Sequence, residues 1–391
     1  MTNGSRFQSR GFTLNYFDLL NKGGRHLGSL DISLQSWRHT ISAFGGFDTA
    51  DFTLVDTESA VDDWAINGLG RKIVVTDEAL SPIWEGFVDS VTLTRGGLSL
   101  TYGPLTDIAN KIFSIYSGVD TSVFPPVIGA RKRSPTFNDL ESQATWGIWP
   151  YILSLAGVTD SNADLLVTMY MKEHHYPEKS TAFSFSGGQG TLTVKCLGWY
   201  NTLVHPYNYT VSTPVFTTIT NRFQQIILAQ PNAGWISTDF ANLQNNSTSV
   251  VAYQNDDQKA IEQIKGYTAM GDASNNRWLF GIYEDRKAYH YPVSNQIDYF
   301  IYLSDPEQRI LDRNNAQVPS WRLRPGKWAF FADFMPGLGS PNAQLEHDPR
   351  AVLIESVTFD MRVPIEFSIT GGHNSQYEQK SAKLGLRGVS V

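Results

Sequence analysis

Alternation of apolar and polar residues, interrupted by glycine turns, is the feature that most constrains the fold of this chain. In LDISLQSW (30–37), Leu30, Ile32 and Leu34 alternate with polar residues. Successive side chains of a strand point to opposite faces of a sheet, so this period of two predicts antiparallel strands in a meander or small barrel. Further stretches of this kind lie at 50–56, 71–77, 83–94 and 98–102.

Two stretches of the chain resemble each other and raise the question of an internal duplication. GGLSLTYGPLTDIANKIFSIY (96–116) and GTLTVKCLGWYNTLVHPYNYT (190–210) each begin with a glycine turn and an alternating strand and then reach Gly103 or Gly198. If each stretch belongs to its own barrel, the two glycines occupy matching corners. If the second stretch completes the first barrel, the unit is not duplicated.

The middle of the chain has a different pattern. Residues 119–180 begin with a basic, proline-bearing segment. Pro150 suits a first helical turn and Gly157 a helix end, so YILSLAG between them predicts a helix. A second helix is predicted for SNADLLVTMYMKEHH, which ends before Pro177. The pattern predicts a mostly helical connector between two β regions.

Shorter elements are predicted on either side of this connector and beyond it. A short helix is predicted at 106–113 and a glycine-turned hairpin at 182–199. Residues 255–272 predict an amphipathic helix, capped by Asn255 or Asp256, with Gly271 past its end. A hairpin around EDRK, two extended segments around Pro325-Gly326, late strands at 352–361 and 363–369, and a polar, mobile tail complete the chain.

Composition and charge exclude several classes of function. The formal net charge of −7 does not support a basic nucleic-acid-binding face. Cys196 is the single cysteine, so an intramolecular disulfide is impossible and a zinc site would lack a thiolate pair. We expect Cys196 to pack as a small hydrophobic residue. No run of about 18 apolar residues and no signal peptide is visible, which predicts synthesis in the cytoplasm and no membrane segment.

The polar residues give no positive indication of catalysis, a cofactor or a metal. His174 and His175 are adjacent, so they cannot chelate one metal as an i, i+4 pair would, and are expected to favour the dipole at a helix end. The acidic loop at 305–316 lacks the central glycine and final glutamate of a calcium loop. The basic run at 130–134 is expected to be a solvated linker.

Two aspartate pairs are also expected to be structural. Asp256-Asp257 is expected to cap a helix, and Asp62-Asp63 to lie in a solvated loop. No nucleophile elbow, phosphate-binding loop, metalloprotease or dinucleotide-binding motif is present in the sequence.

Several local patterns, in their order, resemble the baseplate-hub or tail-tip hub proteins of tailed bacteriophages. They are IWEGFVDSVTLTRGGLSLTYGPLTDIANKI, then SQATWGIWPYILSLAG with its downstream helix, then KAIEQIKGYTAMGD with RWLFGIYEDRKAYHYP, and finally LRPGKWAFFADF. Together they span most of residues 12–370. The resemblance implies two related tube-like β-barrel domains per subunit and a homotrimer that matches a sixfold tail tube on one side and a threefold spike on the other.

The predicted fold class is therefore mainly β with α+β insertions, with two tube-like barrels joined by a helical connector and a small helix–hairpin domain. The predicted segments are a flexible N-terminus (1–10), a first tube-like domain (11–118), the helical connector (119–180), a second β region (181–254), the helix–hairpin domain (255–330), and returning strands with a polar tail (331–391).

The resemblance also implies a place and partners. The chain is expected to be a non-enzymatic structural protein of the virion, at the tail tip or baseplate, without catalytic, cofactor or metal sites. Its implied partners are two further copies of the chain, the tail tube or a distal tail ring, a central spike or fibre, and baseplate proteins. Phage DNA would pass through the channel without specific binding, which agrees with an acidic balance.

Two other functions stay open at this point. A glycan- or receptor-binding β protein of the same particle is suggested by the abundant Trp and Tyr, although residues such as Trp199 and Trp278 are expected in the core. A polysaccharide hydrolase would draw its two carboxylates from distant strands, with the candidates Glu85, Asp89, Glu284 and Asp285.

Overall fold

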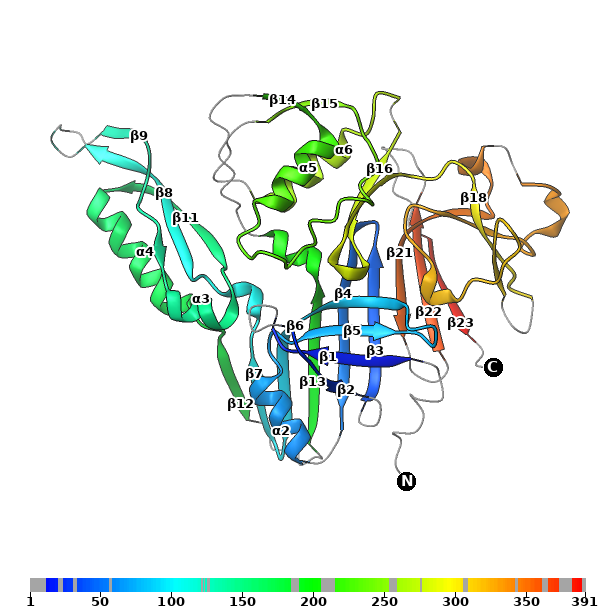
Figure 1. Cartoon of the computed structure of the whole chain (residues 1–391), viewed down its shortest axis with the longest axis horizontal. Coiled ribbons are helices and arrows are strands. Elements are labelled where there is room, and N and C mark those ends of the chain that lie inside the picture. Colours follow the sequence, from blue (N-terminus) through cyan, green and yellow to red (C-terminus); the bar gives the residue numbers. More distant parts are fainter. Residues whose placement is uncertain are drawn as a thin grey trace.

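The computed structural model describes most of the chain. The described residues are 12–19, 24–30, 34–55, 58–120, 122, 124, 127–183, 190–204, 215–252, 259–274, 276–304, 309–341, 344–360, 365–372 and 382–388. Figure 1 shows a β-rich body, an arm of strands and helices that projects from one side of it, and a pair of helices above it. The predicted flexible N-terminus, residues 1–10, lies outside the described residues.

The body is built on one antiparallel sheet, and its main alternating stretches form strands as predicted. Its strands in spatial order are β2 (His26–Ser29), β1 (Thr13–Phe17), β5 (Lys72–Thr76), β6 (Pro82–Arg95), β13 (Thr191–Gly198), β4 (Phe44–Leu54), β3 (Leu34–Ser42), β21 (Ala351–Asp360), β22 (Ile365–Gly372) and β23 (Ala382–Gly388).

The sheet curls so that strands far apart in this order share one core. Leu14 of β1, Trp37 of β3 and Ile73 of β5 are buried in the same cluster. The ring of Phe12, directly before β1, lies 6.0 Å from the ring of Phe359 in β21, although five strands lie between β1 and β21 in this order. Within the described residues the sheet does not close into a barrel, because no pairing joins β2 to β23.

Strand β6 is buried on both faces, as strands inside layered sheets are. Trp84 and Val88 face the core inside the curl, whereas Phe87 joins a second core on the outer face. The second core lies under helices α5 (Ile219–Leu228) and α6 (Ala260–Ala269), which Figure 1 shows above the sheet. A helix is therefore confirmed within the predicted range 255–272, but α6 begins at Ala260 with Lys259 as its N-cap, and the proposed caps Asn255 and Asp256 lie outside the described residues.

The predicted hairpin at 182–199 is wrong. Its second arm, β13, pairs with β4 and β6, whereas β12 (Lys179–Phe183) pairs with β7 (Leu98–Tyr102) on the other side of β6. The two arms are therefore separated by the β6–β7 hairpin, with which each of them pairs from a different side.

The same pairings correct the idea of a duplicated unit. The strand before Gly103 is β7 and the strand before Gly198 is β13, and both flank β6 in a single sheet. The second stretch thus completes the first β structure, and it does not begin a second barrel. The coarser prediction, a mainly β fold with α+β insertions, is confirmed.

The arm is inserted between β7 and β12. Its sheet holds β8 (Lys111–Asp120) at the centre, with β9 (Val127–Arg133) and β10 (Phe137–Asn138) along one edge and β11 (Pro150–Val158) along the other. Helices α3 (Leu140–Trp146) and α4 (Asp160–His174) complete it. Figure 1 shows α4 alongside β8 and β11.

The prediction of a mostly helical connector is therefore only half right. YILSLAG forms strand β11 and not a helix, because its backbone pairs in parallel with β8 from Pro150 to Val158. The predicted helix at 106–113 is reduced to a 3₁₀ turn at Leu105–Asp107, since β8 begins at Lys111. Tertiary pairing overrides local propensity in both places.

A second group of strands extends the body sheet. The predicted hairpin is confirmed as β16 (Trp278–Ile282) and β17 (Ala288–Pro292), and β16 runs parallel to the start of β4. β20 (Trp328–Phe331), β18 (Ile297–Ile301) and β19 (Ile310–Asp312) follow in order from β21. The pair β14 (Val215–Thr218) and β15 (Ser249–Ala252) lies beside α5.

Two further expectations are corrected by the structure. Residues 382–388 of the predicted polar, mobile tail form β23, which pairs with β22. Asp62 and Asp63 lie in helix α2 (Glu58–Asn67) and not in a solvated loop. Asp63 accepts hydrogen bonds from Asn67 and Arg71, which fixes the end of that helix to the strand after it.

Candidate functional site

The junction between arm and body is the most elaborate polar region that the sequence left unassigned. The arm begins and ends at neighbouring strands, since Tyr102 pairs with Lys179 and the amide of Gly103 donates to the carbonyl of Glu178. Insertions of this kind place a folded module at the surface without breaking the parent sheet.

A tryptophan anchors the arm in the outer core of the body. Trp149 is fully buried, and its ring lies 6.3 Å from Phe87 and 5.2 Å from Trp235. Beside it, the side chain of Asn232 exchanges two hydrogen bonds of 2.7 Å with the backbone of Ile148. The base of the arm is thus held by apolar packing and by a fully paired amide.

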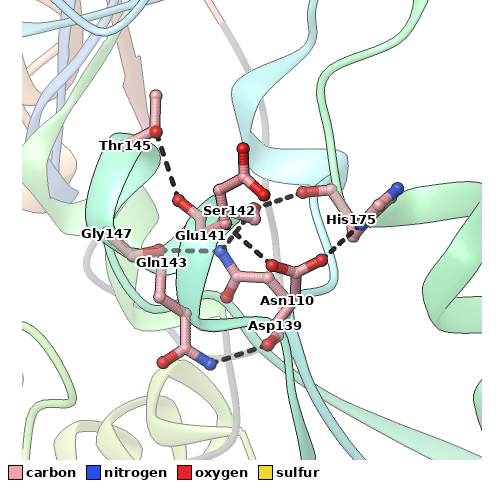
Figure 2. A network of polar contacts seen from close by, with 8 residues as sticks. All are labelled: Asn110, Asp139, Glu141, Ser142, Gln143, Thr145, Gly147 and His175. Atoms are coloured by element: carbon pink, nitrogen blue, oxygen red, sulfur yellow. Dashed lines mark hydrogen bonds and ion pairs between the residues drawn. The ribbon is translucent and has the colours of Figure 1, made fainter.

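A polar network inside the arm joins α3 to the end of α4 (Figure 2). Asp139 is the N-cap of α3, and its carboxylate accepts from the amide of Ser142 at 2.9 Å. Its other oxygen lies 2.5 Å from Nδ1 of His175, the C-cap residue of α4. Hydrogen bonding to His175 lowers the pKa of Asp139, so the carboxylate is ionised at neutral pH and the imidazole donates.

Asn110 completes the network from the start of the arm (Figure 2). Its side chain donates to Ser142 Oγ at 3.0 Å and to the carbonyl of Gly147 at 2.8 Å, and it accepts from the amide of Trp149 at 2.8 Å. Each polar atom of this buried amide therefore has a partner, which is what a structural clamp requires.

The combination of Ser142, His175 and Asp139 does not form a nucleophilic triad. A serine nucleophile gives its proton to the imidazole, but the Ser142 hydroxyl donates to the backbone carbonyl of His175 instead. The side chain of Ser142 is also fully buried. The arrangement positions α3 against α4 and offers no attacking atom to a substrate.

A cleft of about 1250 Å³ lies between the arm and the body, beside this network. His174 and His175 both line it, together with Tyr151 and Tyr170, whose rings stack at 4.8 Å. The two histidines do not converge on one point, since His174 packs against Tyr170 and His175 bonds Asp139. Among the residues described, no group of three histidine, cysteine or acidic side chains could hold a metal ion.

The outer face of the arm exposes apolar side chains. On α4, Ala163 and Val167 are buried against the arm sheet, whereas Leu165 and Met169, on the opposite face, are 57% and 50% exposed. Ile128 on the edge strand β9 is 69% exposed.

The predicted solvated linker at 130–134 falls largely in strand β9. In this strand Lys132 pairs with Asp160 at 2.9 Å, and Arg133 lies over the ring of Phe113 at 3.9 Å.

Glu85, the most buried of the acids proposed for a hydrolase, is held by structural contacts. Its Oε1 lies 2.8 Å from Nζ of Lys72, and its Oε2 accepts from the amide of Asp285 at 2.9 Å. Only 2% of its side chain is exposed. The ion pair joins β5 to β6, and the hydrogen bond from Asp285 ties the β16–β17 turn to them.

The other three acids also have fixed partners. Asp89 accepts two hydrogen bonds of 3.0 Å from Thr106, and burial raises its pKa. Glu284 pairs with Arg324, and Asp285 points to Lys287 at 3.7 Å. Glu284 lines a cleft that Asp89 and Asp285 do not line, so the structure does not assemble these acids as a catalytic pair.

The remaining expectations concern single residues. Cys196 is buried in the inner core as expected, and burial raises its pKa well above the usual value. Trp199 and Trp278 are also buried as expected. Asp256 and Asp257 lie outside the described residues, as does part of the acidic loop at 305–316.

The sequence did not predict the hydrogen-bonded network of Asn110, Asp139, Ser142 and His175, which we call the arm clamp. Asp139 stands directly before a segment with helix-forming residues, which is a capping signal that could have predicted the start of α3. Nothing local indicates its second bond, because His175 lies 36 residues further along the chain.

Comparison with known proteins gives a similarity to a solved structure but not to a protein-family model or a curated protein. No protein-family model matches this sequence, and no curated protein matches it. Among solved structures, the chain is similar to the crystal structure of the 43 kDa tail protein of prophage MuSo2 from Shewanella oneidensis. The TM-score is 0.43 at 8% sequence identity, and the match covers 93% of this chain and 97% of that chain.

Proposed function

We propose that this chain is a structural protein of a phage virion, located at the tail tip or baseplate. In this role three copies form a hub that adapts the sixfold tail tube to a threefold spike or fibre and surrounds the DNA exit channel. The proposal starts from the order of motifs along the sequence, which resembles that of tail hub proteins.

The observation that carries the proposal is the apolar outer face of the projecting arm. Leu165 and Met169 are exposed on one side of α4, with Leu166 between them. Contiguous exposed apolar side chains on a monomer mark a contact surface, whereas single ones need no explanation. A module that stands out from the body and carries such a face is suited to contact a neighbouring subunit of a ring.

A closed ring requires contacts that repeat from one subunit to the next. Such contacts are heterologous, so the arm of one copy meets a different surface of its neighbour, and the rotation between copies closes the ring. The exposed β9 edge, which carries Ile128, adds backbone groups that can pair across such a contact.

Charge supports a channel that lets DNA pass. The formal net charge of the chain is −7, and a negative lining would repel phosphates and prevent DNA from being held. A protein that binds DNA nonspecifically would need a positive charge on the surface that contacts the phosphates.

The proposed role is structural and not enzymatic. Each candidate acid is engaged by a cation, a hydroxyl or a backbone amide, as Glu85 is by Lys72 and Asp89 is by Thr106. The buried serine of the arm clamp likewise has a structural partner. Within the described residues, no helix is both long and apolar enough to cross a membrane.

The experiment measures the mass of the purified full chain by light scattering during size exclusion, with imaging of the particles by electron microscopy. We expect trimers that appear as rings. The double variant Leu165→Lys/Met169→Lys should be folded and monomeric, because charged groups replace the apolar contact. The matched control Leu80→Lys changes a residue that is 78% exposed on the body and should leave the trimer intact.

The proposal fails if the wild-type chain is a monomer at all concentrations tested and does not join purified tail tubes. If the chain is a trimer that both variants leave unchanged, the arm is not the ring contact, and the observation that carries the proposal is removed.

A further inference from the structure

We propose that the cleft beside the β16–β17 hairpin binds an acidic saccharide, a sugar that carries a carboxylate or a phosphate. The cleft has a volume of about 620 Å³ and is lined mainly by residues of the β16–β17 hairpin and of the segment that follows it. The inference does not depend on the tail role, because binding is measured on the chain alone.

Aromatic side chains form one wall of the cleft. Tyr283, Tyr289 and Tyr291 line it, and the rings of Tyr283 and Tyr289 meet edge to face at 5.1 Å. Tyr289 and Tyr291 are partly exposed, whereas Tyr283 is buried behind them. Partly exposed tyrosines offer a ring face for the apolar side of a sugar and a hydroxyl for its polar edge.

The hydroxyl of Tyr289 stays protonated throughout the physiological range and hydrogen-bonds the carboxylate of Glu284. Burial, with the nearby charge of Glu284, raises the pKa of Tyr289 to about 12. The Tyr291 hydroxyl is already held, since it donates to the carbonyl of Pro325 at 3.2 Å. Both hydroxyls thus have partners within the protein, and Tyr289 offers a ligand the exposed part of its ring.

Cations gather at the same cleft in a chain that is acidic overall. Arg313, Arg324 and Lys327 line it, and the carboxylates that pair with them are Glu284 and Asp298. Among the residues that the structure describes, three cations face two carboxylates, which is an excess of one positive charge, although the whole chain carries −7. An anionic group would therefore complete the local charge balance.

The cations differ in how firmly they are held. Arg324 is fixed by its ion pair with Glu284 and by stacking over Tyr283 at 5.0 Å and Phe47 at 5.3 Å. Arg313 and Lys327 share Asp298, and Lys327 lies 3.8 Å from it. Because one carboxylate serves both, Lys327 is the cation that can turn to an incoming anion at small cost.

Amide side chains supply further polar contacts at the rim. Asn276, Asn295 and Gln296 line the cleft and are exposed. An amide offers both a donor and an acceptor, which suits the hydroxyls of a sugar better than a simple inorganic anion. Apolar surface, neutral polar groups and a net cation thus point to an acidic sugar and away from a lipid or a bare ion.

The test compares three probes that differ at one carbon atom: glucose, glucuronic acid and glucose 6-phosphate. Binding to the full chain is measured by saturation-transfer nuclear magnetic resonance and by titration calorimetry at low and high salt. We expect both acidic sugars to bind, with dissociation constants on the order of 1 mM, and glucose to bind at least tenfold more weakly. Preference between the two acids identifies a carboxylate or a phosphate as the natural group.

The variants Lys327→Gln and Arg313→Gln should each reduce the preference for acidic sugars at least fivefold while melting at the wild-type temperature. Tyr289→Ala should weaken all sugars together. The matched control Arg25→Gln, which alters an exposed cation of the body paired only weakly with Asp18, should change nothing.

The proposal is overturned if none of the probes binds, if glucose binds as well as the acids, or if inorganic phosphate competes as well as glucose 6-phosphate. It is also overturned if the Lys327 and Arg313 variants bind as the wild type does. None of these results bears on the trimer, so failure here and failure of the tail role are separable.

Discussion

Nδ1 of His175 lies 2.5 Å from Oδ2 of Asp139 and thereby joins the end of one arm helix to the start of another. The same carboxylate caps α3 through the amide of Ser142. The Asp139 side chain thus both caps α3 and holds the end of α4. The residues next to it in the sequence indicate only the first of these roles.

Replacing this aspartate should loosen the arm. We expect Asp139→Ala to lower the free energy of unfolding by roughly 1–3 kcal/mol, because a helix cap and a charge-assisted hydrogen bond are lost together. Urea unfolding and hydrogen exchange of the α3 amides measure the effect. Asp139→Asn should cost less, since an amide oxygen can still cap the helix. Glu173→Gln on the exposed side of α4 is the control, and an equal loss in this variant would contradict the clamp.

Acid should weaken the hydrogen bond between Asp139 and His175. The pKa of Asp139 is lowered by its bond to His175, so its folded-state value lies below the unfolded value of about 3.9. A carboxyl group of this kind stabilises the fold above the unfolded pKa, and the contribution is lost as pH falls through the folded pKa. The protection of the α3 amides, meaning their exchange rate relative to that of an unstructured chain at the same pH, should therefore fall below about pH 4 in the wild type. In Asp139→Asn the loss of protection should be smaller, and an identical pH profile would refute this account.

His290 should make the body sensitive to milder acid. It is fully buried between the rings of Phe223 at 4.7 Å and Trp278 at 4.5 Å, and burial lowers its pKa to about 3. The unfolded chain takes up a proton near pH 6.5 while the folded chain does not, so stability falls as pH drops from about 6.5 towards 3. The slope from this residue is about 1.4 kcal/mol per pH unit.

The variant His290→Phe should flatten the stability profile between pH 6 and pH 4 by about that slope. Chemical denaturation at a series of pH values measures it. His39 is a second buried histidine whose pKa is lowered to about 3, so some dependence should persist in the variant. An unchanged slope would show that His290 is not the titrating group.

Gly198 should tolerate no side chain. A Cβ atom there would lie 1.7 Å from the carbonyl oxygen of Phe47, in the backbone of the neighbouring strand. We expect Gly198→Ala to cost roughly 3 kcal/mol or more, because β4 and β13 must separate to admit a methyl group. Thermal unfolding of the purified variants measures this.

The matched control is Gly96→Ala, at the β6–β7 turn. Nothing lies within 4 Å of a Cβ atom at Gly96, and only its positive φ of 56° opposes alanine. The cost should be roughly 1–2 kcal/mol. If the two substitutions cost the same, close strand approach is not the reason for glycine at 198.

The sequence by itself determined the elements whose pattern is local. Period-two alternation predicted parts of β3 and β4 and also β5, β6 and β7. The turn EDRK predicted the β16–β17 hairpin, and Gly271 marked the end of α6. In each case neighbours within a few residues carry the information, because alternation, turn chemistry and helix ends are short-range properties.

Only the tertiary structure decided which strands pair and what the polar residues do. β11 resembles a helix in its flanking residues, yet pairs with β8, and β12 and β13 lie on opposite sides of the β6–β7 hairpin. The Asp139–His175 bond and the cleft around Lys327 likewise join residues from separate segments. These contacts depend on backbone pairing and burial between distant segments, and no short window of sequence specifies them.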